Sequence, residues 1–173
     1  MLHMIQKCST IKVLEVFLNE STKMHFIREI SRKIGLATTS VSNNVKELLN
    51  GEFIVKKEGV PFSGYIANRE NDRFIFYKKS HNLYSLYDLK SLIAEELNPK
   101  SIIVFGSYSK GEDIESSDID ILVVSKVKKE INFNKIENKL NRKVHIIIVK
   151  DIKELDKPLR ENISNGIVIH GAI

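Results

Sequence analysis

The stretch SIIVFGSYSKGEDIESSDIDILVVS, residues 101–125, constrains the fold of this 173-residue chain more than any other segment. It holds two short apolar runs, each typical of a buried strand, and between them a turn that opens with Gly106-Ser107. Asp118 and Asp120 stand at the start of the second run. Residues i and i+2 of a strand point to the same side, so we expect the two carboxylates to converge on one spot.

Two neighbouring carboxylates repel each other, and a divalent cation removes that conflict. Upstream, Gly106 lets the backbone approach a phosphate closely, and Ser107 with the N–H groups of the following turn can donate to phosphate oxygens. Lys110 adds a positive charge. The pattern predicts a site for Mg²⁺ or Mn²⁺ and for ATP or another NTP, the requirements of phosphoryl or nucleotidyl transfer. Each part alone is also common in solvated loops and ordinary turns.

Gly106-Ser107, ten residues, and then Asp118-Ile119-Asp120 before an apolar strand is similar to the signature of the DNA polymerase β-like nucleotidyltransferases. The closest resemblance is to the minimal nucleotidyltransferase group, over residues 104–124. It implies a mixed sheet with helices on one side that holds an NTP and Mg²⁺. It also implies that Gly106 and Ser107 bind phosphate and that Asp118 and Asp120 are catalytic metal ligands. The group usually has Arg or another polar residue where this chain has Tyr108.

The same resemblance implies a third catalytic carboxylate on the next strand, KVHIIIV, where this chain has His145. The acids nearest to that strand are Glu137 before it and Asp151 after it. Imidazole binds Mn²⁺ or Zn²⁺ but is a poor ligand for Mg²⁺. His145 is therefore either a third catalytic residue or a strand histidine with a satisfied hydrogen bond. An enzyme and a nucleotide-binding protein without turnover both remain open.

The first 80 residues predict a different domain. Helical periodicity over 9–19, 23–36 and 37–50 is followed by two strand-like segments, 53–59 and 65–79, around a Pro-Gly turn. Three helices and a β-ribbon are the outline of a winged helix-turn-helix, whose third helix would enter the major groove of double-stranded DNA. That helix would bury its apolar stripe, which consists of Val41, Val45, Leu48 and Leu49.

The other faces of the third helix carry polar side chains, and the ribbon carries cations suited to phosphate contacts. The candidate DNA-binding residues are Thr39, Ser40, Ser42, Asn43, Asn44 and Lys46 on the helix, and Lys56, Lys57, Arg69 and Arg73 on the ribbon. Residues 24–54 also resemble prokaryotic winged-helix regulators, with Ser40-Val41-Ser42 at their recognition-helix core. A solvated polar helix, or a winged helix that binds protein, are the alternatives.

The charge distribution supports two domains with different partners. Residues 1–80 hold 13 Lys and Arg against 8 Asp and Glu, whereas residues 81–173 hold 14 of each. A helix over 82–97 would bridge the halves and end before Pro99. We predict an α+β protein with a winged helix-turn-helix over 1–80, a linker helix over 81–98 and a minimal nucleotidyltransferase domain over 99–173.

The remaining expectations concern compartment and partners. A single cysteine, Cys8, excludes an intramolecular disulfide and fits the cytoplasm, and no apolar run is long enough for a membrane span. The predicted function is DNA binding joined to NTP and metal binding, with transfer of NMP to an unknown acceptor. The alternatives are a nucleotide-sensing transcriptional regulator that has lost catalysis and, by family analogy, an antitoxin-like partner of a toxin ribonuclease. Winged helices often dimerise on DNA, so a homodimer is compatible with this prediction.

Overall fold

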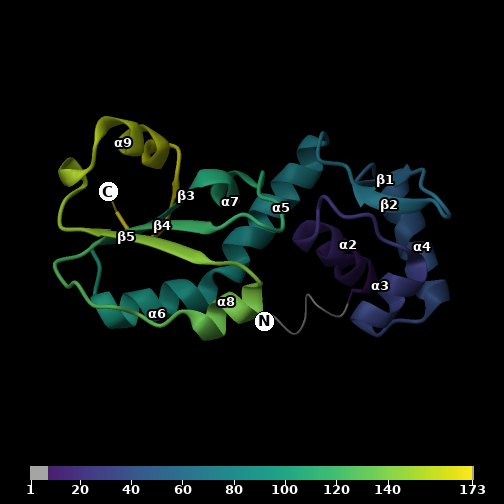
Figure 1. The fold of residues 1–173 in the computed structure, drawn as a ribbon, viewed down its shortest axis with the longest axis horizontal. Helices are drawn as coiled ribbons and strands as arrows, with labels where there is room; N and C mark the ends of the chain where they lie inside the picture. The colour runs from purple at the N-terminus through teal and green to yellow at the C-terminus, as the bar shows by residue number, and fades with distance from the viewer. Residues whose placement is uncertain (1–7, 173) are drawn as a thin grey trace. The chain divides into compact units, whose positions relative to one another are not determined.

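The computed structural model describes residues 8–172, and the chain divides into two compact units, Met1–Phe76 and Tyr77–Ile173 (Figure 1). Residues 1–7 of the predicted first domain and Ile173 of the predicted last one lie outside the described residues. Within the described part, no helix combines the length and the apolar character that a membrane crossing requires.

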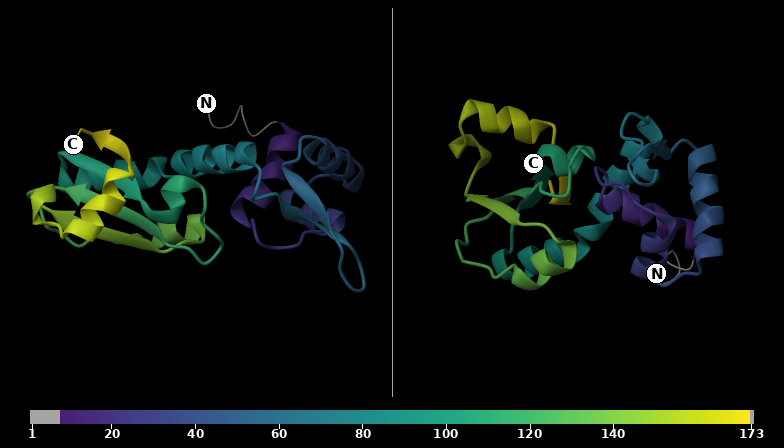
Figure 2. Two further views of the ribbon diagram at one scale, coloured as in Figure 1. Left: turned by 90° about the horizontal axis from the view of Figure 1, so that it is seen from above. Right: turned by 45° about the vertical axis from the view of Figure 1, so that its right-hand side comes forward.

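The first unit contains three helices and a two-stranded antiparallel ribbon. Its elements are α2 (Ser9–Asn19), α3 (Ile27–Ile34), α4 (Thr38–Asn50), β1 (Ile54–Lys57) and β2 (Gly64–Ala67). The three helices lie where the apolar periodicity predicts them. Gly35 ends α3 with a φ of 66°, a left-handed conformation that glycine adopts without the steric cost of a Cβ. The loop between β1 and β2 projects away from the helices (Figure 2).

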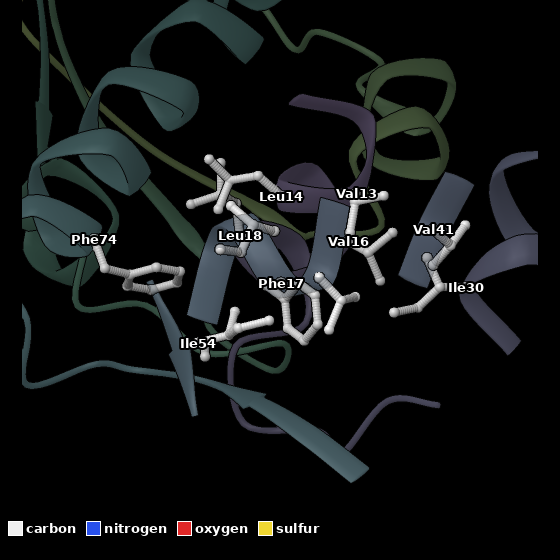
Figure 3. Packing of buried hydrophobic residues seen from close by; sticks show 12 residues of the cluster. Val13, Leu14, Val16, Phe17, Leu18, Ile30, Val41, Ile54 and Phe74 are labelled. Atoms are coloured by element: carbon white, nitrogen blue, oxygen red, sulfur yellow. The ribbon is translucent and has the colours of Figure 1, made fainter. Parts of the chain in front are cut away.

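The core of this unit forms around Phe17, whose side chain is fully buried (Figure 3). Each helix and the ribbon contribute buried apolar side chains, which include Val13, Val16, Ile30, Val41, Val45, Leu48 and Ile54. Of the predicted stripe on α4, the first three residues are buried, and Leu49 packs against the core from a partly buried position. The hydrophobic period therefore accounts for how α4 packs.

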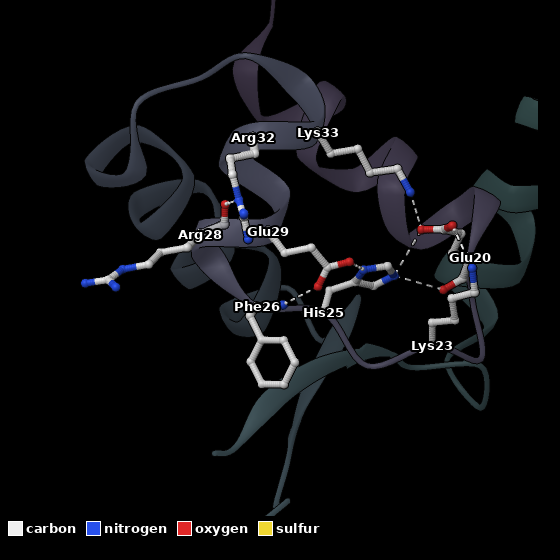
Figure 4. A network of polar contacts seen from close by, with 8 residues as sticks. All are labelled: Glu20, Lys23, His25, Phe26, Arg28, Glu29, Arg32 and Lys33. Carbon is white, nitrogen blue, oxygen red and sulfur yellow. Dashed lines mark hydrogen bonds and ion pairs between the residues drawn. The ribbon is translucent and has the colours of Figure 1, made fainter. Parts of the chain in front are cut away.

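His25 fixes the turn between α2 and α3 (Figure 4). Its buried ring pairs through Nδ1 with Glu29 Oε1 at 3.2 Å and through Nε2 with the carbonyl of Glu20 at 3.3 Å. The backbone N–H and carbonyl of His25 bond those of Tyr65, at 2.8 and 2.9 Å. Glu29 also accepts the N–H of Phe26 at the start of α3. One histidine therefore joins the helix turn to the ribbon.

The predicted second ribbon strand, 65–79, is wrong beyond Ala67. A helix, α5 (Asp72–Ser85), follows instead, and α6 (Tyr87–Leu97) follows it, so that two helices replace the predicted single one over 82–97. The reason is a cap: Asn71 Oδ1 accepts the N–H groups of Arg73 and Phe74, at 2.9 and 3.2 Å, which satisfies free donors of the first turn. Arg73 therefore lies on α5 and Arg69 in the turn after β2, and neither is on the ribbon.

The second unit is built on a four-stranded mixed sheet. Its further elements are β3 (Ser101–Phe105), α7 (Gly106–Lys110), β4 (Ile119–Val124), α8 (Asn134–Leu140), β5 (Val144–Val149), η1 (Ile152–Glu154), α9 (Lys157–Ser164) and β6 (Ile167–Gly171). The strand order is β5-β4-β3-β6. β4 and β5 run parallel, whereas β3 is antiparallel to both β4 and β6.

Helices cover both faces of this sheet, so the expectation of helices on one side is wrong (Figure 1). α6 and α8 pack on the face that carries Ile119, Ile121 and Val123. The short α9 packs on the opposite face through Ile163 and adjoining residues, against Leu122 and its neighbours. The alternation along β4 thus assigns Asp120 to the face of Leu122.

Candidate functional site

Asp120 is the centre of the candidate site. It is the second residue of β4, where its backbone pairs with Phe105 of β3 and with His145 of β5. Nδ1 of His145 lies 3.1 Å from Oδ1 of Asp120. The Asp120 side chain is 29% exposed and that of His145 is 63% exposed, so the pair is open to solvent and to a ligand.

Gly106 packs directly on the other oxygen of this carboxylate. Its φ is +70°, and a Cβ placed on it would lie 2.4 Å from Asp120 Oδ2. A side chain at position 106 would therefore displace the carboxylate as well as strain the backbone. The sequence predicts that Gly106 lets a phosphate approach the backbone closely. The structure shows that the Asp120 carboxylate also lies close to this backbone.

α7 places the other residues of the predicted phosphate turn. Ser107 follows Gly106 in the first turn of α7 and is half-buried, and its carbonyl accepts the N–H of Glu112 at 3.0 Å. Lys110 is exposed at the opposite end of this five-residue helix. Tyr108 points into the core, where its hydroxyl lies 2.8 Å from Ser85 Oγ, and burial raises the pKa of Tyr108. Because position 108 faces the core, the aromatic Tyr108 fits there in place of a polar residue.

Asp118 is exposed and directly precedes β4, separated from Asp120 by the fully buried Ile119. It lines an open hollow of about 260 Å³ with polar residues of its own loop and of the α8 region, among them Ser116, Asn138, Asn141 and Lys143. Among residues 8–172, no three His, Cys, Asp or Glu side chains are clustered as a metal site. Asp120 is not among the residues that line this hollow, so the convergence of the two carboxylates stays a prediction.

The two acids that flank β5 in the sequence, Glu137 and Asp151, are each engaged in a structural role. Glu137 accepts the N–H of Val144 at 2.9 Å and the ammonium of Lys143 at 3.0 Å, and the backbone hydrogen bond, followed by the one from Lys143, lowers the pKa of Glu137. Asp151 caps η1 through the N–H of Lys153, at 2.9 Å. Both acids have structural partners of their own, and His145 alone faces Asp120 from β5.

Sequence reasoning missed a buried polar network below the loop that carries Asp118. Asp113 is 1% exposed; its Oδ2 lies 3.0 Å from Lys78 Nζ, and its Oδ1 accepts Asn82 Nδ2 at 2.7 Å. Arg142 Nη2 lies 3.5 Å from the same carboxylate. In the sequence, Asp113 stands among several acids and reads as part of a solvated loop. The one available signal was the four-residue spacing of Lys78 and Asn82, which places both on the same face of a helix.

This geometry agrees with a comparison against known families. Residues 86–170 match the family model for a nucleotidyltransferase domain. The match contains β3, α7 and β4 with Gly106, Asp118 and Asp120, and it contains His145. The fold of the second unit, a mixed sheet with helices, is consistent with that family.

One curated relative shares a short segment with the chain. It is a protein of Methanocaldococcus jannaschii provisionally named protein adenylyltransferase, and it is 53% identical over 34 residues. The segment is 20% of this chain and 35% of the relative, so the chain spans about a third of the length of that relative. The family match and this relative both support a role in nucleotidyl transfer.

In the first unit, the structure exposes most of the predicted DNA-binding side chains. Thr39, Asn43 and Lys46 are exposed on α4 and recur at a helical spacing. Ser40 and Ser42 are half-buried, and Lys56 and Lys57 are exposed on β1. 

Asn44 does not lie on the polar face of α4. It is 6% exposed, and its Oδ1 accepts the hydroxyls of Ser9 and Thr10 at 3.3 and 2.9 Å. Its place beside Val45, on the side of α4 that meets α2, explains the burial. Asn44 therefore joins two helices and is not available to a base edge.

Proposed function

We propose that the nucleotidyltransferase domain binds a nucleoside triphosphate with a divalent cation and transfers the nucleoside monophosphate to an acceptor. The observation that carries the proposal is the Asp120 carboxylate, held between the backbone of Gly106 and the imidazole of His145, with Asp118 two residues before it. The name of the partial relative favours ATP as the donor and a protein as the acceptor.

The residues present fit one magnesium ion shared with the substrate. Mg²⁺ is commonly held by one or two carboxylates, substrate phosphates and waters, so Asp118 and Asp120 are a sufficient protein contribution. The absence of a Cβ at Gly106 leaves the backbone close to the Asp120 carboxylate, where phosphate oxygens would meet the cation. When bound, the ion neutralises phosphate charge and polarises the α-phosphoryl group.

The reaction is an in-line displacement at the α-phosphorus. An acceptor hydroxyl oxygen bonds to that phosphorus, the bond to the bridging oxygen breaks, and pyrophosphate leaves; the hydroxyl proton passes to water. Gly106 and Ser107 orient the phosphates through the N–H groups that begin α7. Catalysis of this kind depends on position and charge more than on covalent help from the protein.

Whether the domain turns NTP over or only binds it depends on His145. An imidazole contributes no negative charge beside Asp120 in either protonation state, which reduces the attraction for a second cation near the attacking hydroxyl. A domain that binds NTP without transfer, as a nucleotide sensor, is the alternative function that this residue favours.

Label transfer tests the proposal. The chain is incubated with lysate and ATP labelled at the α-phosphate, with Mg²⁺ or Mn²⁺, and the acceptor is identified by gel and mass spectrometry. Label should appear with α-labelled ATP and not with γ-labelled ATP. Asp118→Asn/Asp120→Asn should abolish it, and Asp88→Asn, on exposed helix surface, serves as the control.

Titration of the same proteins with MgATP separates the alternatives. MgATP binding without label transfer would establish the sensor function, and neither binding nor transfer would contradict the proposal as a whole.

We further propose that the first unit is a winged helix that binds double-stranded DNA. Three helices precede a ribbon, the exposed face of α4 is polar, and the neighbouring α3 exposes Arg28 and Arg32. Cations beside a polar helix suit phosphate contacts around a groove.

Binding of the intact chain to a random-sequence duplex tests this second proposal across a salt series. Its affinity should fall steeply as salt rises, because bound cations displace counterions from the phosphates. Negligible affinity at low salt would contradict it.

A further inference from the structure

The segment that joins α7 to β4 carries the candidate site at both of its ends, with Gly106 and Ser107 before it and Asp118 and Asp120 after it. It has no regular secondary structure over residues 112–118. Asp120 is already held in β4, but such a loop holds Asp118 in a productive position only if something else fixes its backbone.

A buried anion supplies that fixation. Asp113 lies five residues before Asp118, and both its side chain and that of Lys78 are 1% exposed. Each carboxylate oxygen has its own partner, since Oδ2 pairs with Lys78 Nζ at 3.0 Å and Oδ1 accepts Asn82 Nδ2 at 2.7 Å. Asn82 also donates to the carbonyl of Tyr108 in α7, at 2.9 Å, so one amide joins α7 to the start of the loop.

Arg142 provides a second anchor from the segment between α8 and β5. Its Nη2 lies 3.5 Å from Asp113 Oδ2, and its Nη1 donates to the backbone carbonyl of Glu115. The guanidinium is 7% exposed and presents a planar fork, a shape that can hold a carboxylate and a carbonyl together. The loop is thus bound at Asp113 and Glu115, just ahead of Asp118.

A purely stabilising role is the weaker explanation of this network. Burial of two charges has a large desolvation cost, and well-packed apolar residues often stabilise a fold as well or better. The charged groups converge on the loop that carries Asp118, and hydrogen bonds that orient ligand-bearing segments commonly control affinity at such sites.

We propose that Asp113 is a positioning residue, and that its buried contacts with Lys78, Asn82 and Arg142 hold the loop so that Asp118 and Asp120 can receive a nucleotide-bound cation. The inference rests on the proposed function, because it names the device that prepares that same site.

The test uses three variants of the full chain. Asp113→Asn keeps the shape and removes the charge, whereas Lys78→Met/Asp113→Asn removes the buried pair and leaves no unpaired lysine. Arg142→Lys is the mildest change, since an ammonium keeps the charge but loses the fork. The matched control is Lys139→Met/Asp88→Asn, which removes an exposed pair elsewhere in the same unit.

Two measurements are made on each protein: MgATP affinity by calorimetry, and backbone amide exchange without ligand. We expect the three network variants to bind MgATP about 10- to 100-fold more weakly, the range typical of lost supporting contacts. Exchange should rise over residues 112–120 while β3 and β5 stay protected. The control should match the wild type in both measurements.

The outcomes separate this inference from the proposed function. Wild-type MgATP affinity in a folded double variant, or in Arg142→Lys, would overturn the positioning role and leave nucleotide binding intact. Loss of protection across the whole sheet in all three variants would also overturn it, because the network would then serve stability alone. Failure of the wild type itself to bind MgATP would refute the proposed function, and the positioning role would fall with it.

Discussion

His145 and Asp120 are direct neighbours on the parallel strands β5 and β4, with Nδ1 of the imidazole 3.1 Å from Oδ1 of the carboxylate. The contact places a neutral or cationic ring where a third carboxylate would add negative charge. The contact stabilises the Asp120 carboxylate, because the imidazole can donate a hydrogen bond to it.

Replacement of His145 by Asp should therefore lower the stability of the ligand-free protein and increase its response to magnesium. Two carboxylates on adjacent strands repel each other and destabilise the sheet, and Mg²⁺ relieves the repulsion. Thermal unfolding with and without millimolar Mg²⁺ measures both effects. His145→Asn, which adds no charge, is the control, and an equal Mg²⁺ shift in all three proteins would contradict the prediction.

Gly106→Ala should be more harmful than the same change at Gly35. Both glycines have left-handed φ values, +70° and +66°, so alanine costs about 1–2 kcal/mol at either position. No atom lies within 4 Å of a Cβ at Gly35, whereas one at Gly106 would lie 2.4 Å from Asp120 Oδ2. Urea unfolding should show the larger loss for Gly106→Ala, and only that variant should lose MgATP affinity. Equal losses with intact MgATP binding would refute the close contact.

Asn43 and Asn44 are sequence neighbours with opposite expected phenotypes. Asn44→Ala leaves the hydroxyls of Ser9 and Thr10 without their shared acceptor, although Thr10 also donates to Glu47. The free energy of unfolding should fall by about 0.5–1.5 kcal/mol, the net contribution of a typical hydrogen bond, because the two hydroxyls are only half-buried. The exposed Asn43→Ala should leave stability unchanged and weaken DNA binding. Duplex titration alongside urea unfolding distinguishes them, and a stable Asn44→Ala would count against its structural role.

The sequence predicts the strands of the sheet well because they depend on local signals. The alternation of Ile119, Ile121 and Val123 with Asp120 and Leu122 is visible in the sequence, and β4 follows it. The partner of Asp120 follows from strand order, since β5 lies parallel beside β4 and brings His145 opposite.

Sequence patterns fail to predict the structure where the buried side chains are polar. Phe74, Lys78 and Asn82 form one buried stripe of α5 at four-residue spacing, but two of the three are hydrophilic, so no hydrophobic period reveals the helix. The aromatic residues around Phe74 favour a strand by composition, and the Asn71 cap overrides that preference. Asn44 is the same case on α4, because an amide that binds a neighbouring helix looks like a surface residue until the helices are packed.

His81 should make the stability of the protein fall as the pH drops below about 7. Burial, followed by the positive charge of Lys78, lowers the pKa of His81, and the opposing attraction of Asp113 is smaller. In the unfolded chain its pKa returns to about 6.5. Below that pH the unfolded state binds a proton that the folded state does not, so the free energy of unfolding falls as the pH drops, by at most about 1.4 kcal/mol per pH unit. The loss ends once the pH passes below the lowered folded pKa. Urea unfolding of the wild type and of His81→Gln at half-unit steps measures the slope. The variant should have the shallower slope whatever its absolute stability, and parallel curves would show that His81 does not titrate differently in the two states.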